Sequence, residues 1–188
     1  METLSREGFE QQIEKMLGEM RLGKVFVYPT DTIYGIGCDA TNPASVGRIR
    51  ALKEREKRPF SVIAPSLEWI MCNCQVGRRE KEWLEKLPGP YTLIVRLANK
   101  AAVCPAVNYG LATIGVRMPN GWFTGAVAKA GIPFVTTSVN VTGKPFMTSA
   151  ANINPGIKED VDYLIDVGPL KNKPSKVVDL VLGKTVRE

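Results

Sequence analysis

Helical and β-rich segments alternate along this chain, and that alternation constrains its fold more than any other feature. Apolar residues recur at three- and four-residue intervals over 5–22, which predicts an amphipathic helix that ends at Gly23. A short β-rich run, 24–28, follows, and Asn42 before Pro43 is typical of the start of a second helix. We expect further strands at 60–64, 92–97, 113–117, 133–138 and 176–181, and further helices at 66–87 and, capped by Asn120, up to residue 131. This order predicts an α/β fold built on a twisted sheet.

The chain length and the N-terminal residues indicate the general class of protein. A length of 188 residues is typical of one domain with a substantial core, so we expect a single domain over residues 1–188. The first residues lack the basic and apolar regions of a secretory signal, and no apolar run approaches the ~20 residues of a membrane helix. We therefore expect a cytoplasmic protein without membrane contact. A formal charge of +6 suits a polyanionic partner such as ATP or RNA, although solubility alone explains it equally well.

The chain contains no histidine, which excludes several kinds of active site. Histidine is the commonest metal ligand and the commonest general base, and Ser-His and Cys-His nucleophilic sites depend on it. Among the four cysteines the only close pair, Cys72 and Cys74, lacks the two-residue spacing typical of zinc and redox sites. We therefore expect reduced structural thiols, no zinc, no organic cofactor and no metal held by protein side chains.

A basic stretch over 48–58 is the strongest candidate for binding an anion. Six of its eleven residues are basic and two are acidic. The alternative is a solvated helix face with internal ion pairs. However, Lys53 lies close to the apolar stripe of this helix, so the lysine must snorkel, or line a cleft, or the helix must end there. Lys53 and Arg55 reach one ligand only if the helix unwinds near Lys53, and such a basic helix end suits polyphosphate.

Several polar segments follow predicted strands and are further candidates. The segment PTDTIYGIG (29–37) combines hydroxyls with glycines that allow close approach of the backbone, although a structural turn explains it equally well. Ser138 and Asn140 leave a predicted strand on one side of the chain, with turn formation as the alternative. Arg117 shares a strand face with Thr113 and is well placed to bind a carboxylate. The loop over 142–155 is rich in Gly, Pro, Ser, Thr and Asn and is a candidate for a mobile flap.

Six segments, in this order along the chain, resemble the YrdC family of threonylcarbamoyl-adenylate synthases. They are PTDTIYGIG (29–37), KER (53–55), PGPYT (88–92), IGVRMP (114–119), SVNVTG (138–143) and PSKVVD (174–179). The resemblance runs from about Gly23 to the C-terminus. It implies a YrdC-like fold, in which a twisted mixed sheet with flanking helices curls around a basic concave cleft.

The resemblance also implies a reaction and a set of site residues. ATP, bicarbonate and L-threonine would give threonylcarbamoyl-AMP and pyrophosphate, with Mg²⁺ bound to the ATP phosphates. Lys53 and Arg55 would be the catalytic pair that holds these phosphates. Arg58 is a further candidate because the segment from Arg55 to Pro59 is shorter than in many members. The implied contacts to the nucleotide are Thr113, Ser138, Asn140 and Arg187. The implied contacts to threonine are Thr32, Arg117, Thr136 and Ser175.

The product would feed the N6-threonylcarbamoyl modification of adenosine 37 in tRNA, through a downstream threonylcarbamoyl-transferase complex. One alternative is a non-catalytic protein whose basic cleft binds double-stranded RNA or tRNA through phosphate contacts. A weaker alternative is carbamoyl transfer, as in hydrogenase-maturation proteins that contain this domain within much longer chains.

Overall fold

The computed structural model describes residues 1–55 and 58–188, and its strands form one continuous sheet. The strands follow the spatial order β1-β8-β2-β3-β7-β4-β6-β5-β9-β10. Their bounds are β1 (Glu2–Leu4), β2 (Phe26–Tyr28), β3 (Gly35–Gly37), β4 (Ser61–Ile63), β5 (Tyr91–Arg96), β6 (Thr113–Arg117), β7 (Phe134–Ser138), β8 (Tyr163–Ile165), β9 (Lys176–Asp179) and β10 (Lys184–Arg187).

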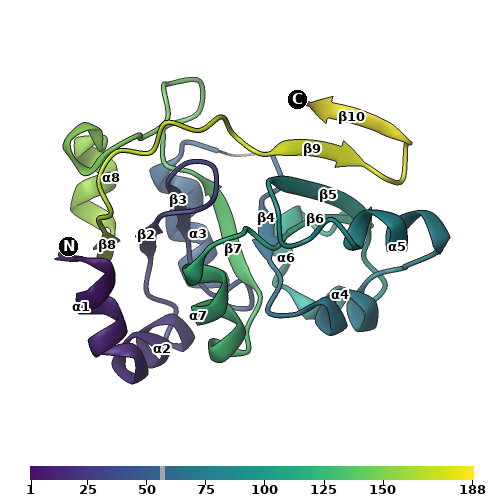
Figure 1. Cartoon of the computed structure of the whole chain (residues 1–188), viewed down its shortest axis with the longest axis horizontal. Helices are drawn as coiled ribbons and strands as arrows, with labels where there is room; N and C mark the ends of the chain where they lie inside the picture. The colour runs from purple at the N-terminus through teal and green to yellow at the C-terminus, as the bar shows by residue number, and fades with distance from the viewer. Residues whose placement is uncertain (56–57) are drawn as a thin grey trace.

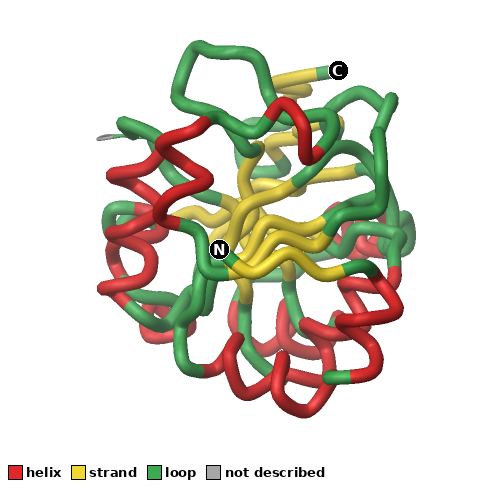
Figure 2. The backbone as a smooth tube through the Cα atoms, turned by 90° about the vertical axis from the view of Figure 1, so that its left-hand side faces the viewer, coloured by secondary structure: helices red, strands yellow, loops and turns green. Residues whose placement is uncertain are grey.

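Helices flank this sheet (Figure 1). They are α1 (Arg6–Gln11), α2 (Ile13–Arg21), α3 (Pro43–Leu52), α4 (Leu67–Asn73), α5 (Arg78–Leu84), α6 (Pro105–Asn108), α7 (Trp122–Ala130) and α8 (Pro155–Asp160), with 3₁₀ turns at η1 (Lys100–Ala102) and η2 (Ala150–Asn152). Strand pairs of both senses occur: β4 runs parallel to β6 and antiparallel to β7. Figure 2 shows the strands as a twisted layer with helices at its flanks. The predicted α/β fold with a twisted mixed sheet is therefore confirmed.

The buried apolar side chains form two clusters of different composition. The larger is mainly aliphatic and lies along the sheet together with α3 and α4. The smaller packs α1, α2 and α7 against the sheet and contains most of the buried aromatic rings, including Tyr28 stacked on Phe123 at 4.1 Å between ring centroids. Clustering the few aromatic residues in one place lets a chain with 7% aromatic content gain edge and stacked contacts between rings.

The helix caps show how local chemistry places the elements. Asn42 Oδ1 accepts the Ser45 amide at 3.1 Å, so the predicted start of α3 is confirmed. The predicted cap at Asn120 is wrong: Gly121 is the N-terminal cap of α7, and the main-chain N–H of Asn120 donates to the carboxylate of Asp31 at 2.9 Å. This contact to the 29–32 segment holds the main chain at Asn120, one residue before the cap.

Two predicted helices are each divided in the structure. The helix predicted over 5–22 changes direction at Gln12, which separates α1 from α2. The helix predicted over 66–87 is interrupted after Asn73, because Cys74 is extended and forms an isolated β-bridge with Leu97. The strands β1, β3, β8 and β10 and the helices α6 and α8 were not predicted. A strand of three or four residues is too short to show a reliable period in the sequence.

No helix among the described residues combines the length and the apolar character that a membrane crossing requires.

Candidate active site

A cavity of about 430 Å³ lies between the 29–35 segment, β6, β7 and the C-terminal strands. Such a volume suits a small-molecule ligand. Eight of the eleven predicted site residues line it: Thr32, Arg55, Thr113, Arg117, Thr136, Ser138, Ser175 and Arg187. These residues are up to 155 positions apart in the sequence, and the sheet order brings them together because β7 lies between β3 and β4 while β9 lies beside β5.

Lys53 ends α3, and the chain unwinds directly after it. The sequence made this unwinding the condition for Lys53 and Arg55 to reach one ligand. Lys53 is the C-terminal cap of the helix, and Glu54 takes a left-handed backbone conformation with φ of 47°. A non-glycine residue in this region is uncommon, and here it turns the chain out of the helix. Arg55 consequently lines the cavity instead of continuing the solvated face of α3.

The Lys53 side chain is buried, with 1% exposure, and its ammonium points at the turn that follows β7. It donates to the Ser138 carbonyl, to the Asn140 carbonyl at 2.9 Å and to Asn140 Oδ1 at 3.2 Å. Burial, aided by the nearby charge of Arg55, lowers the pKa of Lys53 to about 7. Lys53 therefore lies behind the cavity wall and is not in its lining, and its contact with ATP remains a prediction.

Arg55 is held by oxygen atoms of its own loop and of β7. Its Nη2 donates to the Pro59 carbonyl at 2.7 Å, its Nε to the Arg58 carbonyl at 3.2 Å, and its Nη1 to the Thr137 hydroxyl at 3.4 Å. Burial, and then the charges of Arg50 and Arg58, lower the pKa of Arg55. Residues 56 and 57, which belong to the predicted basic stretch, lie outside the described residues. Arg58 is exposed and is not among the residues that line the cavity.

Arg117, on β6, is a buried cation that lines the cavity. Its Nη2 donates to Asp31 Oδ1 and to the Thr32 hydroxyl, each at 3.3 Å. Burial lowers the pKa of Arg117, and the Asp31 carboxylate opposes this effect. An arginine stays charged in such a setting, so the cavity wall carries a fixed positive charge with donors to spare.

Two polar atoms in this wall have no hydrogen-bond partner among the described residues, namely Arg117 Nε and Thr136 Oγ1. Both residues line the cavity. A buried polar atom without a partner costs about 1–3 kcal/mol, so a folded protein rarely keeps two of them in one cavity wall without a reason. A ligand with acceptor oxygen atoms would satisfy both.

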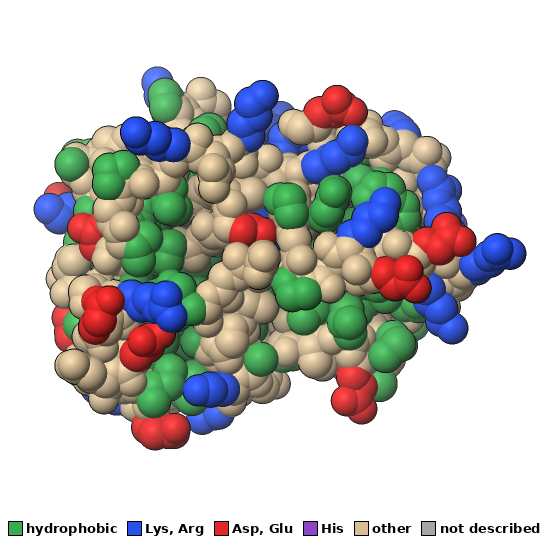
Figure 3. Space-filling view, viewed as in Figure 1, with side chains coloured by type: hydrophobic (Ala, Val, Ile, Leu, Met, Phe, Trp, Pro, Cys, Tyr) green, Lys and Arg blue, Asp and Glu red, His purple; other side chains and the backbone are tan. Residues whose placement is uncertain are grey.

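The C-terminal strands close another side of the cavity. Ser175 Oγ and Thr92 Oγ1 lie 2.8 Å apart, and the Arg187 guanidinium donates to the Ser175 carbonyl at 2.7 and 2.9 Å. Arg187 lies on β10. In the view of Figure 3, several Lys and Arg side chains lie along the upper edge of the molecule, on the side of this strand. The β9–β10 hairpin thus adds positive charge to the rim.

The turn after β7 is ordered by its own side chains. Ser138 donates to Asn140 Oδ1 at 2.6 Å, and Asn140 Nδ2 donates to the Val141 and Lys144 carbonyls at 3.0 and 2.8 Å. Asn140 does not line the cavity in this conformation. Its predicted contact with the nucleotide therefore stays a prediction, and its observed contacts are those of a turn.

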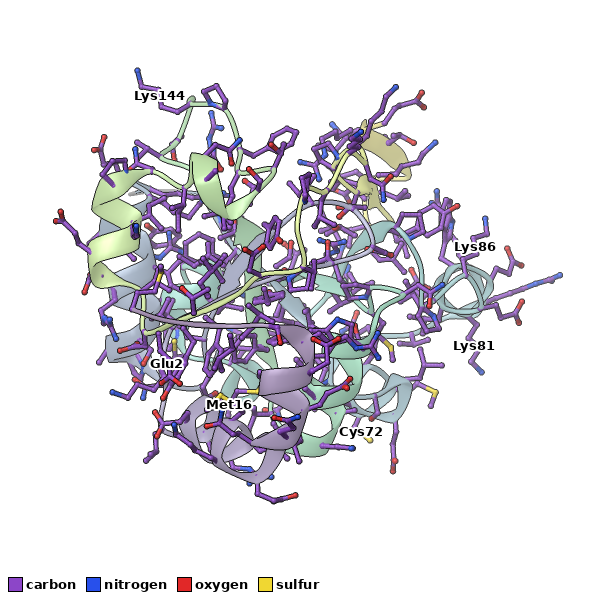
Figure 4. All side chains as sticks on the ribbon, turned by 60° about the vertical axis from the view of Figure 1, so that its left-hand side comes forward. Glu2, Met16, Cys72, Lys81, Lys86 and Lys144 are labelled. Atoms are coloured by element: carbon purple, nitrogen blue, oxygen red, sulfur yellow. The ribbon has the colours of Figure 1, made fainter. Side chains whose placement is uncertain are left out.

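The 142–155 loop lies beside the segment between β8 and β9 (Figure 1). Phe146 and Pro174 contribute to the lining, and the Leu170 amide donates to the Thr148 carbonyl at 2.8 Å, which joins the two segments. Lys144, at the tip of the loop, points away from the molecule (Figure 4). The loop is anchored at its base because the Thr142 amide and hydroxyl both donate to the Lys53 carbonyl, at 3.0 and 2.9 Å.

Asp31 and Arg50 are residues of this region that the sequence did not single out. Asp31 lies inside the quoted 29–37 segment, yet its partner Arg117 is 86 positions away, so no local signal reveals the pair. Arg50 lies in the basic stretch, where the pattern does not distinguish it from the other cations.

Comparison with known proteins places this geometry in a family context. The family model named Sua5_yciO_yrdC and described as "Telomere recombination" matches residues 19–188. A Methanocaldococcus jannaschii protein provisionally named a threonylcarbamoyl-AMP synthase is 31% identical over 186 residues, which cover 97% of this chain and 87% of that protein. The threonylcarbamoyl-AMP synthase of Vibrio campbellii is 28% identical over 185 residues, which cover 95% of this chain and 99% of that protein.

Two solved structures share the fold along nearly the whole chain. P. abyssi Sua5 in complex with L-threonine superposes with a TM-score of 0.79 at 30% identity over 95% of this chain and 53% of that one. This chain thus spans about half the length of that Sua5 protein. E. coli YciO superposes with a TM-score of 0.80 at 25% identity, over 99% of this chain and 94% of that one.

Proposed function

This chain belongs to the Sua5/YciO/YrdC family, and we propose on that basis that it is a threonylcarbamoyl-AMP synthase. The enzyme would be a nucleotidyltransferase that uses ATP, bicarbonate and L-threonine. Its product, threonylcarbamoyl-AMP, would pass to a separate transferase complex that modifies adenosine 37 of tRNA.

The observation that carries this proposal is the pair of unpartnered atoms in the cavity wall. Arg117 Nε and Thr136 Oγ1 are buried donors without an acceptor in the described protein. Arg117 already uses another of its nitrogen atoms on Asp31, so its free donor suits a second carboxylate. The carboxylate of a bound amino acid would supply it in a charge-assisted hydrogen bond.

The proposed chemistry needs orientation and charge more than a protein acid or base. The amine of threonine adds to the carbon of bicarbonate, water leaves, and a carbamate remains. A carbamate oxygen then attacks the α-phosphorus of ATP, the bond from that phosphorus to the bridging oxygen breaks, and pyrophosphate leaves with the bonding electrons. Arg55, on the cavity wall, would neutralise phosphate charge, and Lys53 would exchange a carbonyl of the 138–140 turn for a phosphate oxygen. Positioning and fixed charges supply most of the rate in such displacements.

Magnesium would enter as part of the Mg–ATP substrate. The described residues contain no group of three or more His, Cys, Asp or Glu side chains placed to hold a metal ion. Asp179, a carboxylate in the cavity lining, accepts the amides of Val181 and Leu182 at 2.9 and 2.8 Å and is committed to that turn. That the ion is carried by the phosphates alone stays a prediction.

The test is a reconstitution with ATP, L-threonine and bicarbonate that measures pyrophosphate release and the adenylate product. We expect product only when all three substrates are present. Arg117→Gln should raise the KM for threonine by at least tenfold, whereas Arg96→Gln, which changes an exposed arginine on the neighbouring strand β5, should leave it unchanged. Pyrophosphate release that does not depend on threonine would refute the proposal. Steeply salt-dependent binding of double-stranded RNA without any adenylate formation would favour the RNA-binding alternative.

A further inference from the structure

Arg50, on the last turn of α3, makes an unusual set of contacts. Its guanidinium donates to four main-chain carbonyls: Ala106 at 2.6 Å, Val107 at 3.1 Å, Arg55 at 3.0 Å and Arg58 at 3.1 Å. None of the ion pairs among the described residues includes Arg50. The side chain therefore joins the α6 segment to the loop that follows Lys53 through hydrogen bonds.

Aromatic rings complete the environment of this guanidinium. Its central carbon lies 4.0 Å from the ring centroid of Tyr109 and 4.4 Å from that of Phe60. The guanidinium of Arg55 lies over the same Phe60 ring, at 5.1 Å. Ring faces and carbonyl oxygens attract cations without neutralising them, so Arg50 and Arg55 stay close together and both stay charged.

The loop that Arg50 binds through hydrogen bonds is the one from which Arg55 reaches the cavity. Two of the four acceptors are the carbonyls of Arg55 and Arg58, and Arg55 itself donates to the Arg58 carbonyl. Arg50 is absent from the cavity lining, whereas Arg55 is part of it. Arg50 therefore acts on a ligand only through the cavity residues that it contacts, of which Arg55 is the cation.

We propose that Arg50 is a positioning residue that holds the main chain at Arg55 and Arg58 so that Arg55 meets the phosphates of ATP. The inference rests on the proposed function because it takes ATP as the ligand of Arg55. A lysine at position 50 would keep the charge but could not bridge four carbonyls or lie flat against two rings, because it has three donors at one point.

The first test compares Arg50→Lys with wild type and with a matched control. Arg48→Lys changes a second arginine of α3 that pairs with Asp162 at 2.9 Å and Asp160 at 3.3 Å, outside the cavity. We expect Arg50→Lys to weaken ATP binding about tenfold in direct titration and to raise the KM for ATP, with kcat and the KM for threonine within about twofold of wild type. Arg48→Lys should change none of these. Unchanged ATP affinity in Arg50→Lys, or an equal rise of both KM values, would overturn the proposal.

The second test is a double-mutant cycle that separates positioning from general loss of structure. If Arg50 acts through Arg55, the double variant Arg50→Lys/Arg55→Gln should bind ATP no more weakly than Arg55→Gln alone. Additive losses would show that Arg50 does not act through Arg55. Because ATP binding is measured directly, a wild-type protein that binds ATP but makes no adenylate would refute the proposed function and leave this inference intact. A wild-type protein that binds no ATP would refute both.

Discussion

The buried ammonium of Lys53 makes the stability of this protein depend on pH in a way that one substitution should remove. The side chain is 1% exposed, and its pKa falls from the ordinary lysine value of 10.5 to about 7. Below pH 7 both the folded and the unfolded chains carry the proton. Between about pH 7 and 10.5 the unfolded chain binds more protons at this site than the folded one, so the free energy of unfolding rises with pH and reaches its full value above 10.5.

The size of this effect follows from the two pKa values. Each pH unit within the window adds up to about 1.4 kcal/mol, and the whole window corresponds to roughly 5 kcal/mol as an upper bound. Lys53→Met removes the titrating group. It also leaves the Ser138 and Asn140 carbonyls without this donor, which costs about 1–3 kcal/mol at every pH and does not alter the slope.

The assay is urea unfolding of wild type and Lys53→Met at pH 7, 8 and 9. We expect the wild-type free energy of unfolding to rise relative to that of the variant by about 1 kcal/mol per pH unit. Other titrating groups, such as Cys74 with its raised pKa, occur in both proteins and cancel in the difference. Lys129→Met, which removes an exposed lysine of α7, is the control and should run parallel to wild type. Parallel curves for wild type and Lys53→Met would refute the reasoning.

Three further substitutions test other parts of the structure. Thr136→Val removes a buried hydroxyl that has no partner, so it should leave the Tm unchanged or raised in thermal unfolding while the KM for threonine rises; a lowered Tm would show that the hydroxyl has a structural partner. Gly37→Ala should prevent stable folding, as seen by circular dichroism, because a Cβ there would lie 1.8 Å from a main-chain carbonyl oxygen of β7; a native spectrum would contradict this. Asp31→Asn leaves the buried Arg117 without its carboxylate and should cost about 3 kcal/mol in urea unfolding, whereas Asp160→Asn, in an exposed pair, should cost under about 1 kcal/mol.

Helix α3 has one feature that its local sequence pattern predicts and one that the pattern does not predict. An apolar stripe with a lysine on its edge requires that the lysine snorkel, line a cleft or end the helix, and the structure takes the third course at Lys53. The pattern could not show where the ammonium would then point. Its acceptors lie 85 and 87 positions away, on a turn whose proximity depends on β7 lying between β3 and β4.

The errors in the predicted elements have the same origin. Asn120 has the chemistry of a helix cap, yet its main-chain N–H is bonded to Asp31 from another part of the chain and Gly121 caps the helix. Cys74 lies inside a helical pattern, yet it pairs with Leu97 as an isolated bridge. In both places a long-range hydrogen bond outweighed a local preference of about 1 kcal/mol or less.

The sequence by itself determined the class of fold, the family motifs and most of the polar residues that line the cavity, because periodicity, capping and residue chemistry act over a few neighbouring positions. Tertiary structure alone decided which of these residues share one wall. In the folded chain Arg117 lies against Asp31, and Arg117 Nε and Thr136 Oγ1 have no partner among the described residues. Arg50 is hydrogen-bonded to the carbonyl of Arg55. The physical reason is the order of strands in the sheet, which joins segments far apart in the chain and which only the packing of the whole chain specifies.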